Sequence, residues 1–163
     1  MRRLKKPSPQ RSAIMRAVKS RDTGPERAVR ALAWAIAPGY RLNRRDMPGT
    51  PDVVYVSRRL AIFVHGCFWH GHACPRSTVP KTNRAFWIDK IARNRARDSR
   101  VAGQLRRAGW RVLTIHECAL DKPAAVEAKL RRALAQAPRA DEGSNSRLQR
   151  PRPRLSQRRG TAT

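Results

Sequence analysis

The amino-acid sequence predicts an α/β sandwich with a mixed β-sheet, and three observations lead to this class. Helix-like and strand-like segments follow one another in the order α-α-β-β-β-loop-α-β-α. Two short apolar segments, 52–56 and 60–64, are separated by residues 57–59 and are typical of a buried hairpin. A third apolar segment, 110–116, follows a long basic helix. Such an order favours helices packed against a single sheet.

The N-terminal part predicts two helices. Ser12 precedes a short amphipathic segment, 13–20, and is a suitable N-cap. Thr23 and Glu26 form an S/T-x-x-E capping box, and the helix that begins there continues to about Ile36, where Pro and Gly end it.

The remaining elements follow from local patterns. Alternating polarity predicts a half-exposed strand over 40–45, and the prolines and glycine of 47–51 predict a turn. Residues 66–80 are rich in Gly, Pro, Cys and His and are expected to be irregular. A long basic helix is expected over 82–108, and a last helix over 123–134.

Composition limits the class of partner. The 163 residues fit one domain with tails better than two domains. Lys and Arg number 37 against 11 Asp and Glu, which gives a net charge of +26. Such an excess favours a polyanion, namely DNA or RNA ahead of an anionic membrane surface.

Other protein classes are excluded by what the sequence lacks. No run of about 18 apolar residues is present, so we expect no membrane span. The basic N-terminus has no apolar segment of the kind that secretory signals carry. Three cysteines cannot all pair within one chain, which argues against a disulfide framework and favours a reducing cytoplasm.

We divide the chain into three parts. Residues 1–11 are a basic flexible arm, residues 12–138 are the folded domain, and residues 139–163 are an Arg-rich tail. The tail is polar, interrupted by prolines and without periodicity, so we expect it to be disordered. It is either a solvated tail or an additional phosphate contact.

The segment 63–74 holds three of the four histidines and two of the three cysteines. Cys67, His72 and Cys74 lie on one short loop, and Cys118 is the remaining cysteine. Together they make a Cys3His set, which is a closed tetrahedral zinc site and therefore structural. The alternative is three ordinary buried thiols.

Two histidines and one aspartate remain for chemistry. His65 and His70 suit proton transfer or metal contact near neutral pH, or are merely polar neighbours of the zinc site. Asp52 opens a strand and is suited to Mg²⁺; its alternative role is strand capping. The hairpin places position 52 beside the main chain near Val64. Phosphodiester hydrolysis needs a cation, a base and an acid, and Asp52 with Mg²⁺, His70 and His65 can supply them.

Aromatic and basic residues suggest contact with nucleic acid. Phe68 and Trp69 lie between expected metal ligands, and Trp87 begins the basic helix; each is either a wedge between base pairs or part of the core. Asp98, on the same helix, can orient a catalytic histidine. Candidate phosphate contacts on that helix are Arg84, Lys90, Arg93, Arg95 and Arg97.

Five stretches resemble the very short patch repair (Vsr) endonucleases. They are SAIMRAVKSRDTGPE, YRLNRRDMPGTPDVVY, FVHGCFWHGHACP, VPKTNRAFWIDKIARNRARD and GWRVLTIHECAL, and together they span about residues 12–120. The HGCFWHGHxCP block is the most specific of them. The resemblance implies a restriction-endonuclease-like fold: a three-layer α/β/α sandwich with a central mixed β-sheet and a zinc-stabilised loop.

The resemblance also implies an activity. Such enzymes nick one strand of double-stranded DNA 5′ to the thymine of a T·G mismatch, which arises by deamination of 5-methylcytosine, in a Mg²⁺-dependent hydrolysis. A T·G pair stacks less well than a Watson–Crick pair, so a wedge enters there at a cost lower by about 1–3 kcal/mol. We expect a cytoplasmic, nucleoid-associated monomer with no membrane contact and with repair helper proteins as further candidate partners.

Site residues carry over position by position. The resemblance implies Mg²⁺ at Asp52 with a main-chain contact from Val64, and places Glu26 near the reaction centre. It implies His70 as general base, supported by Asp98, with His65 as a transition-state or leaving-group helper. The expected structural zinc ligands are Cys67, His72, Cys74 and Cys118, and the expected DNA wedge is Phe68, Trp69 and Trp87.

The chain departs from the wider fold family at one motif. Val64 and Gly66 stand around His65 where an acid and a lysine are usual. Some Vsr relatives carry Thr at position 64; Val has no hydroxyl, but its main-chain carbonyl contact is unaffected. The Arg-rich tail has no counterpart in the resemblance.

Two other functions fit part of the pattern. One is a zinc-stabilised DNA-binding module without catalysis, which would bind a mismatch and leave it uncut. The other is a restriction endonuclease of the same fold that acts on matched DNA. Nicking of T·G and fully paired duplexes separates these readings.

Overall fold

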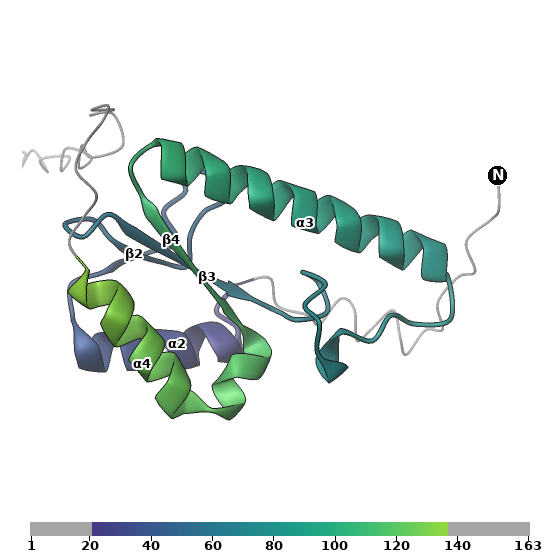
Figure 1. The fold of residues 1–163 in the computed structure, drawn as a ribbon, viewed down its shortest axis with the longest axis horizontal. Helices are drawn as coiled ribbons and strands as arrows, with labels where there is room; N and C mark the ends of the chain where they lie inside the picture. The colour runs from purple at the N-terminus through teal and green to yellow at the C-terminus, as the bar shows by residue number, and fades with distance from the viewer. Residues whose placement is uncertain (1–20, 137–163) are drawn as a thin grey trace, which may run out of the picture.

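The computed structural model describes residues 21–136, which form one four-stranded sheet with helices on both of its faces (Figure 1). The mixed α/β class is therefore confirmed. The helix expected over 13–20, the arm and the tail lie outside the described residues. The elements are α2 (Gly24–Ile36), β1 (Arg41–Leu42), β2 (Val53–Tyr55), β3 (Leu60–His65), η1 (Pro75–Ser77), α3 (Arg84–Arg107), β4 (Arg111–His116), η2 (Glu117–Asp121) and α4 (Pro123–Ala135).

The strand order is β1-β2-β3-β4, and the sheet is mixed. β1, β2 and β3 pair antiparallel, and β2 with β3 forms the expected hairpin. β4 pairs parallel with β3, after the chain has passed through α3, and His65 lies opposite His116 in the register. The carboxyl ends of β3 and β4 therefore lie side by side.

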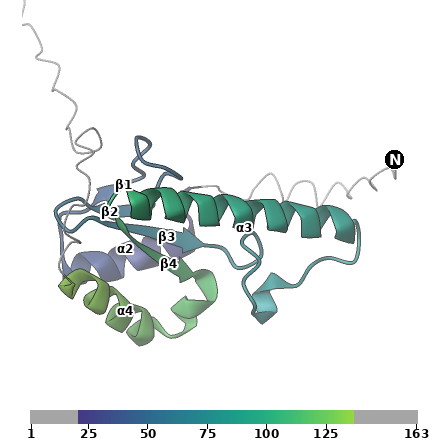
Figure 2. The same cartoon turned by 45° about the horizontal axis from the view of Figure 1, so that its top comes forward.

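Each face of the sheet is covered by different helices. α2 and α4 lie on one face, and α3 crosses the other (Figures 1 and 2). Neighbouring side chains of a strand point to opposite faces, so Val53 and Val54 enter different apolar clusters. This coverage explains why β2 is apolar at every position, since a strand buried on both faces does not alternate.

The larger core lies between the sheet and the α2–α4 pair. Tyr55 is anchored there, because its hydroxyl lies 2.9 Å from the carbonyl oxygen of Ala33 and 2.7 Å from that of Ala37. This pair of contacts fixes the end of α2 to β2. The buried members are Val29, Ala33, Val53, Tyr55, Leu60, Ile62, Ile115, Val126, Leu130 and Leu134.

The second core lies under the carboxyl-terminal half of α3. It contains Met47, Val54, Ala61, Phe63, Leu105 and Trp110. The amino-terminal half of α3 extends beyond the sheet, and the loop that follows β3 lies beneath it (Figure 1).

The two largest differences between the expected and the observed element ends are in β1 and α3. The strand expected over 40–45 is reduced to Arg41–Leu42, because Asn43 adopts a left-handed conformation (φ 46°) and ends it. The long helix begins at Arg84 rather than Thr82, because Asn83 before it is also left-handed (φ 56°). Within 21–136, no helix combines the length and apolarity that crossing a bilayer would need.

Candidate active site and metal centre

The segment that follows β3 is wound into tight turns by its own backbone. The amide of His70 donates to the carbonyl of Gly66 (3.3 Å), and that of His72 donates to Cys67 (3.0 Å). A further bond joins the amide of Cys74 to the carbonyl of His72 (2.8 Å). These bonds place His65 and His70 in one polar cluster and Cys67, His72 and Cys74 in another.

Gly71 allows this loop to pack closely against α3. Its φ is +59°, and a Cβ atom built there would lie 2.5 Å from Cγ2 of the buried Ile91. Both the left-handed backbone and the close approach therefore require glycine at this position. The contact fixes the loop between His70 and His72, one member of each cluster.

A cleft of about 680 Å³ opens beside the carboxyl ends of β3 and β4. Arginines also line it, including Arg95, Arg97 and Arg106, which gives the opening a positive potential. Every residue expected from the sequence to act in catalysis lines this one cleft: Glu26, Asp52, Val64, His65, His70 and Asp98.

Asp52 is held at the floor of the cleft by the hairpin. Its amide donates to the carbonyl of Ile62 (3.1 Å), and its Oδ2 accepts a 2.7 Å hydrogen bond from the amide of Val64. Burial raises the pKa of Asp52 to about 6; the Val64 hydrogen bond opposes the shift, and the Glu26 carboxylate adds to it. The sequence expectation that position 52 lies beside the main chain of Val64 is met.

The two histidines form a stacked pair. Their ring centroids are 3.7 Å apart with an interplanar angle of 9°. Nδ1 of His70 lies 2.5 Å from Oδ2 of Asp98, which orients the His70 ring. Burial, with a further contribution from His70, lowers the pKa of His65 to about 4. His65 is therefore neutral at pH 7, while His70 has the carboxylate partner that a general base needs.

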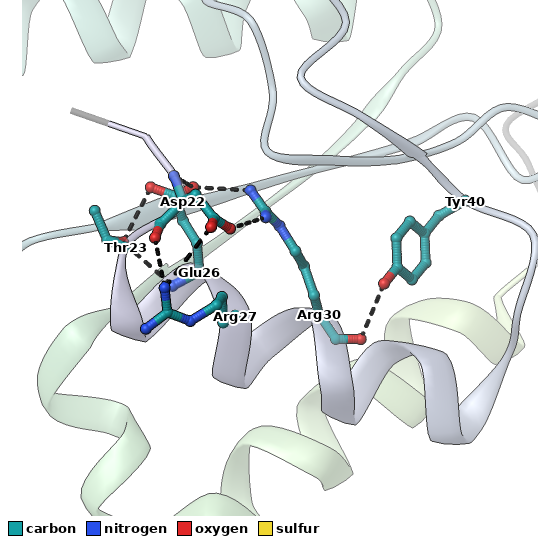
Figure 3. Close-up of polar contacts among 6 residues, drawn as sticks. All are labelled: Asp22, Thr23, Glu26, Arg27, Arg30 and Tyr40. Atoms are coloured by element: carbon teal, nitrogen blue, oxygen red, sulfur yellow. Dashed lines mark hydrogen bonds and ion pairs between the residues drawn. The ribbon is translucent and has the colours of Figure 1, made fainter. Parts of the chain in front are cut away.

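Glu26 lies in the first turn of α2, where it is held by polar contacts (Figure 3), and it lines the cleft. The capping box forms, because the Thr23 hydroxyl accepts from the Glu26 amide at 3.4 Å and donates to Oε1 at 3.0 Å. Oε2 accepts from the Asp22 amide and from Nη2 of Arg30, each at 2.9 Å. The Glu26 carboxylate is buried, but the ion pair with Arg30 and the hydrogen bonds offset the cost of burying its charge and fix its position.

The three cysteines and His72 form a separate cluster. One ligand atom from each of Cys67, His72, Cys74 and Cys118 lies within 4.8 Å of the others. Sγ of Cys118 is 3.4 Å from Nδ1 of His72, and no cysteine is in a disulfide. Three sulfurs and one nitrogen at this separation fit the donor set of tetrahedral zinc.

The thiol pKa values of the cluster differ with their surroundings. Burial raises the pKa of Cys67 to about 11, whereas a hydrogen bond with His72 lowers the pKa of Cys74 to about 7. Cys74 is thus more ready than Cys67 to deprotonate for a metal. The expected ligands from residues 67–74 and from the distant Cys118 do come together.

The aromatic residues expected to contact DNA form one group, in which Phe68 and Trp69 of the loop after β3 lie against Trp87 in the first turn of α3. Phe68 lies 5.0 Å from Trp69 and 5.4 Å from Trp87, both edge to face. All three are only partly buried and lie outside both apolar cores. Phe86, which was not predicted from the sequence, joins this group, with its ring centroid 5.2 Å from that of Trp87.

Lys90, one of the expected phosphate contacts, also packs against the aromatic residues. Its ammonium lies over the rings of Trp69, Phe86 and Trp87, at 5.3 to 5.8 Å from their centroids. At such distances it attracts the ring faces. Arg93, another expected phosphate contact, pairs with Asp89 at 2.6 Å.

His116 is the site residue that sequence analysis did not single out. It lines the same cleft, at the end of β4. Burial lowers its pKa, and nearby imidazoles add to the effect. Only part of the signal was present in the sequence: His116 ends a predicted strand, but its place beside His65 depends on the parallel pairing of that strand with β3.

Comparisons with known proteins agree on one group. A family model described as DNA mismatch endonuclease Vsr matches residues 5–76. The type II nicking enzyme V.XorIIP of Xanthomonas oryzae pv. oryzae is 49% identical over 128 residues, which cover 78% of this chain and 94% of that protein. The DNA mismatch endonuclease Vsr of Escherichia coli K12 is 44% identical over 110 residues, which cover 68% of this chain and 70% of that protein.

Proposed function

The chain belongs to the Vsr family and is a DNA endonuclease, a hydrolase of DNA mismatch repair, and we propose that it nicks one strand of duplex DNA 5′ to the thymine of a T·G mismatch. The proposed reaction is Mg²⁺-dependent phosphodiester hydrolysis. One observation carries the proposal: Asp52, the His65–His70 pair and Asp98 line a single cleft that arginines also line.

We assign the magnesium site to the Asp52 carboxylate and the main-chain carbonyl of Val64. The buried carboxylate supports this assignment, because a nearby cation favours its ionised form and offsets the cost of burial. When bound, Mg²⁺ would stabilise negative charge on the phosphoryl oxygens and orient the phosphate. Mg²⁺ keeps several waters and needs few protein ligands, which suits a site with one carboxylate.

The protein's own groups would move the proton. His70 is the proposed general base and takes a proton from the attacking water, and Asp98 stabilises the resulting imidazolium through its contact with Nδ1. His65 contacts the phosphoryl or leaving oxygen as the transition state forms. Glu26 is placed near the reaction centre, where its buried carboxylate acts on Asp52.

We propose that the Cys67, His72, Cys74 and Cys118 cluster holds a structural zinc ion. Four protein ligands would complete a tetrahedral zinc site and would leave no coordination position for substrate. The ion would join the loop after β3 to the segment after β4. Its contribution is to the position of the loop, and thereby to His70.

The proposed wedge for the mismatch is Phe68, Trp69 and Trp87. Their edge-to-face packing leaves a partly exposed aromatic surface beside the cleft, which supports this assignment. An aromatic group that separates base pairs acts at lower cost where pairing is already weak. The wedge therefore selects the mismatch before any base edge is read.

The wider setting is proposed on the same basis. We assign residues 12–138 to an endonuclease domain of the restriction-endonuclease-like, three-layer α/β/α class, with a basic arm before it and an Arg-rich tail after it. Helices on both sheet faces support the class. The chain would act as a monomer on nucleoid DNA in the cytoplasm, with repair helper proteins as additional partners.

A panel of duplexes tests the proposal. The full-length protein is incubated with T·G, the other mismatches and a fully paired duplex, in Mg²⁺ and in chelator. We expect a single nick on the thymine strand of T·G, and only with divalent metal present. Equal cutting of paired DNA would identify a restriction enzyme instead, and binding without cutting would identify a DNA-binding module.

A further inference from the structure

All four histidines of the chain form one continuous series of ring contacts. His70 stacks on His65, and His65 meets His116 edge to face, with centroids 5.9 Å apart and an interplanar angle of 75°. His116 in turn stacks on His72, at 4.0 Å and 21°. The series begins with His70 in the cleft and ends with His72, a proposed ligand of the metal cluster formed by Cys67, His72, Cys74 and Cys118.

The β-sheet fixes the middle of this series. His65 and His116 are the last residues of two parallel strands and are direct partners in the register. Their backbones therefore cannot separate without breaking the end of the sheet. The His116 ring therefore supports the His65 ring edge to face while His70 stacks on it.

We propose that His116 is a positioning residue for the nicking reaction: its ring holds the His65 ring in its stack with His70 and links that pair to the metal cluster through His72. This inference rests on the proposed roles of His65 and His70. It assigns no proton transfer to His116. It requires the flat ring of His116 and not its nitrogen atoms.

The physical reason is the position of the His116 ring between His65 and His72. The rings that contact His65 are Phe63, His70 and His116, and His116 alone among them also stacks on His72. Removing the His116 ring would leave a gap between His65 and His72, and side chains beside a gap lose contacts and relax. Small displacements of reacting groups reduce rates strongly even where the fold persists.

Two variants of the full-length protein test the inference, His116→Ala without a ring and His116→Phe with one. The measurements are the single-turnover nicking rate on T·G duplex in Mg²⁺, the Kd for that duplex without Mg²⁺, the zinc content and the imidazole NMR signals of His65. We expect His116→Ala to nick about 10- to 100-fold more slowly with unchanged Kd and zinc content. His116→Phe should recover most of the rate, and the His65 signals should move only in His116→Ala.

Three results would overturn the inference. Wild-type nicking by His116→Ala would show that the ring is not needed. Equal loss in both variants would show that a nitrogen atom is needed instead. If His116→Ala lost zinc as well as nicking rate, the ring of His116 would only maintain the fold of the metal cluster. If the wild type itself fails to nick T·G, the proposed function fails, and unchanged His65 signals in His116→Ala would then refute the positioning contact separately.

Discussion

The loop after β3 serves two clusters with contrasting chemistry. The metal cluster brings together three sulfurs and one nitrogen, and its Cys67 is completely buried. The cleft cluster brings together imidazoles and carboxylates around an opening of about 680 Å³. The first set is suited to enclose an ion, and the second to meet a solvated substrate.

The contrast explains how a short irregular segment becomes precise enough for catalysis. Loops lack the repeated hydrogen bonds of helices and strands, so their side chains are poorly fixed unless something else holds them. Here Gly71 packs on α3, and His72 and Cys118 join the loop to the segment after β4. His70, one residue from Gly71, is placed by the same constraints. Disruption of the metal cluster should therefore have consequences different from those of disruption of the cleft cluster.

The largest expected effect is on the cleft side. Asp52→Ala removes the proposed magnesium ligand, and nicking should fall by a factor on the order of 10³ or more, because a bound cation stabilises the transition state by several kcal/mol. Zinc content and T·G binding should stay as in the wild type. Glu127→Gln, which changes an exposed carboxylate on α4, is the control and should nick normally. Continued nicking by Asp52→Ala would refute the assignment.

The metal-cluster side should respond differently. Cys118→Ser removes one ligand from a closed set, so we expect zinc to fall from about one per chain to a small fraction and the melting temperature to fall by about 10 °C or more. Elemental analysis and thermal unfolding measure both. A wild-type protein that is well folded and zinc-free would contradict the structural role, whereas Asp52→Ala should leave both quantities unchanged.

A smaller effect is expected at the wedge. Trp69→Ala should reduce the preference for T·G over paired duplex by about 10- to 100-fold, the energy scale of a single mismatch, and should weaken paired-DNA binding less. Kd values for the two duplexes measure the preference. Trp34→Ala is the matched control, because Trp34 is 58% exposed on α2, on the other face of the sheet. Equal losses on both duplexes would mean that Trp69 only packs.

The smallest effect is expected in the apolar core, where a substitution should change stability and leave both clusters intact. Tyr55→Phe removes a buried hydroxyl and leaves the carbonyls of Ala33 and Ala37 without its hydrogen bond, so unfolding free energy should fall by about 1–3 kcal/mol with nicking retained. Chemical denaturation measures this change. A loss of nicking at temperatures where the variant is fully folded would contradict the separation.

The same residue predicts a dependence on alkaline pH. Burial raises the pKa of Tyr55 to about 12, whereas an unfolded tyrosine titrates near about 10. The unfolded state therefore loses its proton first, and this contribution to stability is present below pH 10 and declines as pH rises from about 10 through about 12. Denaturation midpoints should show a shallower alkaline decline in Tyr55→Phe. Parallel curves for the two proteins would contradict the assignment.

Sequence predicted the elements whose patterns are strong. The capping box at Thr23 and Glu26, the apolar hairpin and the strand over 111–116 are local signals, and each forms where expected. Left-handed turns at Asn43 and Asn83 shortened other elements, because a non-glycine residue with positive φ leaves little trace in a hydrophobicity pattern. The register of β4 on β3 depends on long-range pairing and could not be read from local sequence.

The same division holds for the site. Asp52, His70 and the four metal ligands were proposed from residue type and spacing, and the fold brings each group together. The ring contacts of His116 and the position of Lys90 over three aromatic rings were not predicted. Their surroundings depend on strand register and on how the loop lies along α3. Contacts between distant segments cannot be derived from spacing alone.

One measurement tests the division between the two clusters most directly. The protein is treated with a mild chelator, zinc content is followed, and nicking of T·G duplex is measured on adding back Mg²⁺ alone. We predict that nicking is lost and then fully restored by Mg²⁺, with about one zinc per chain throughout. Restoration only by zinc, with zinc leaving and returning in step with activity, would contradict a structural metal cluster beside a separate magnesium-dependent cleft.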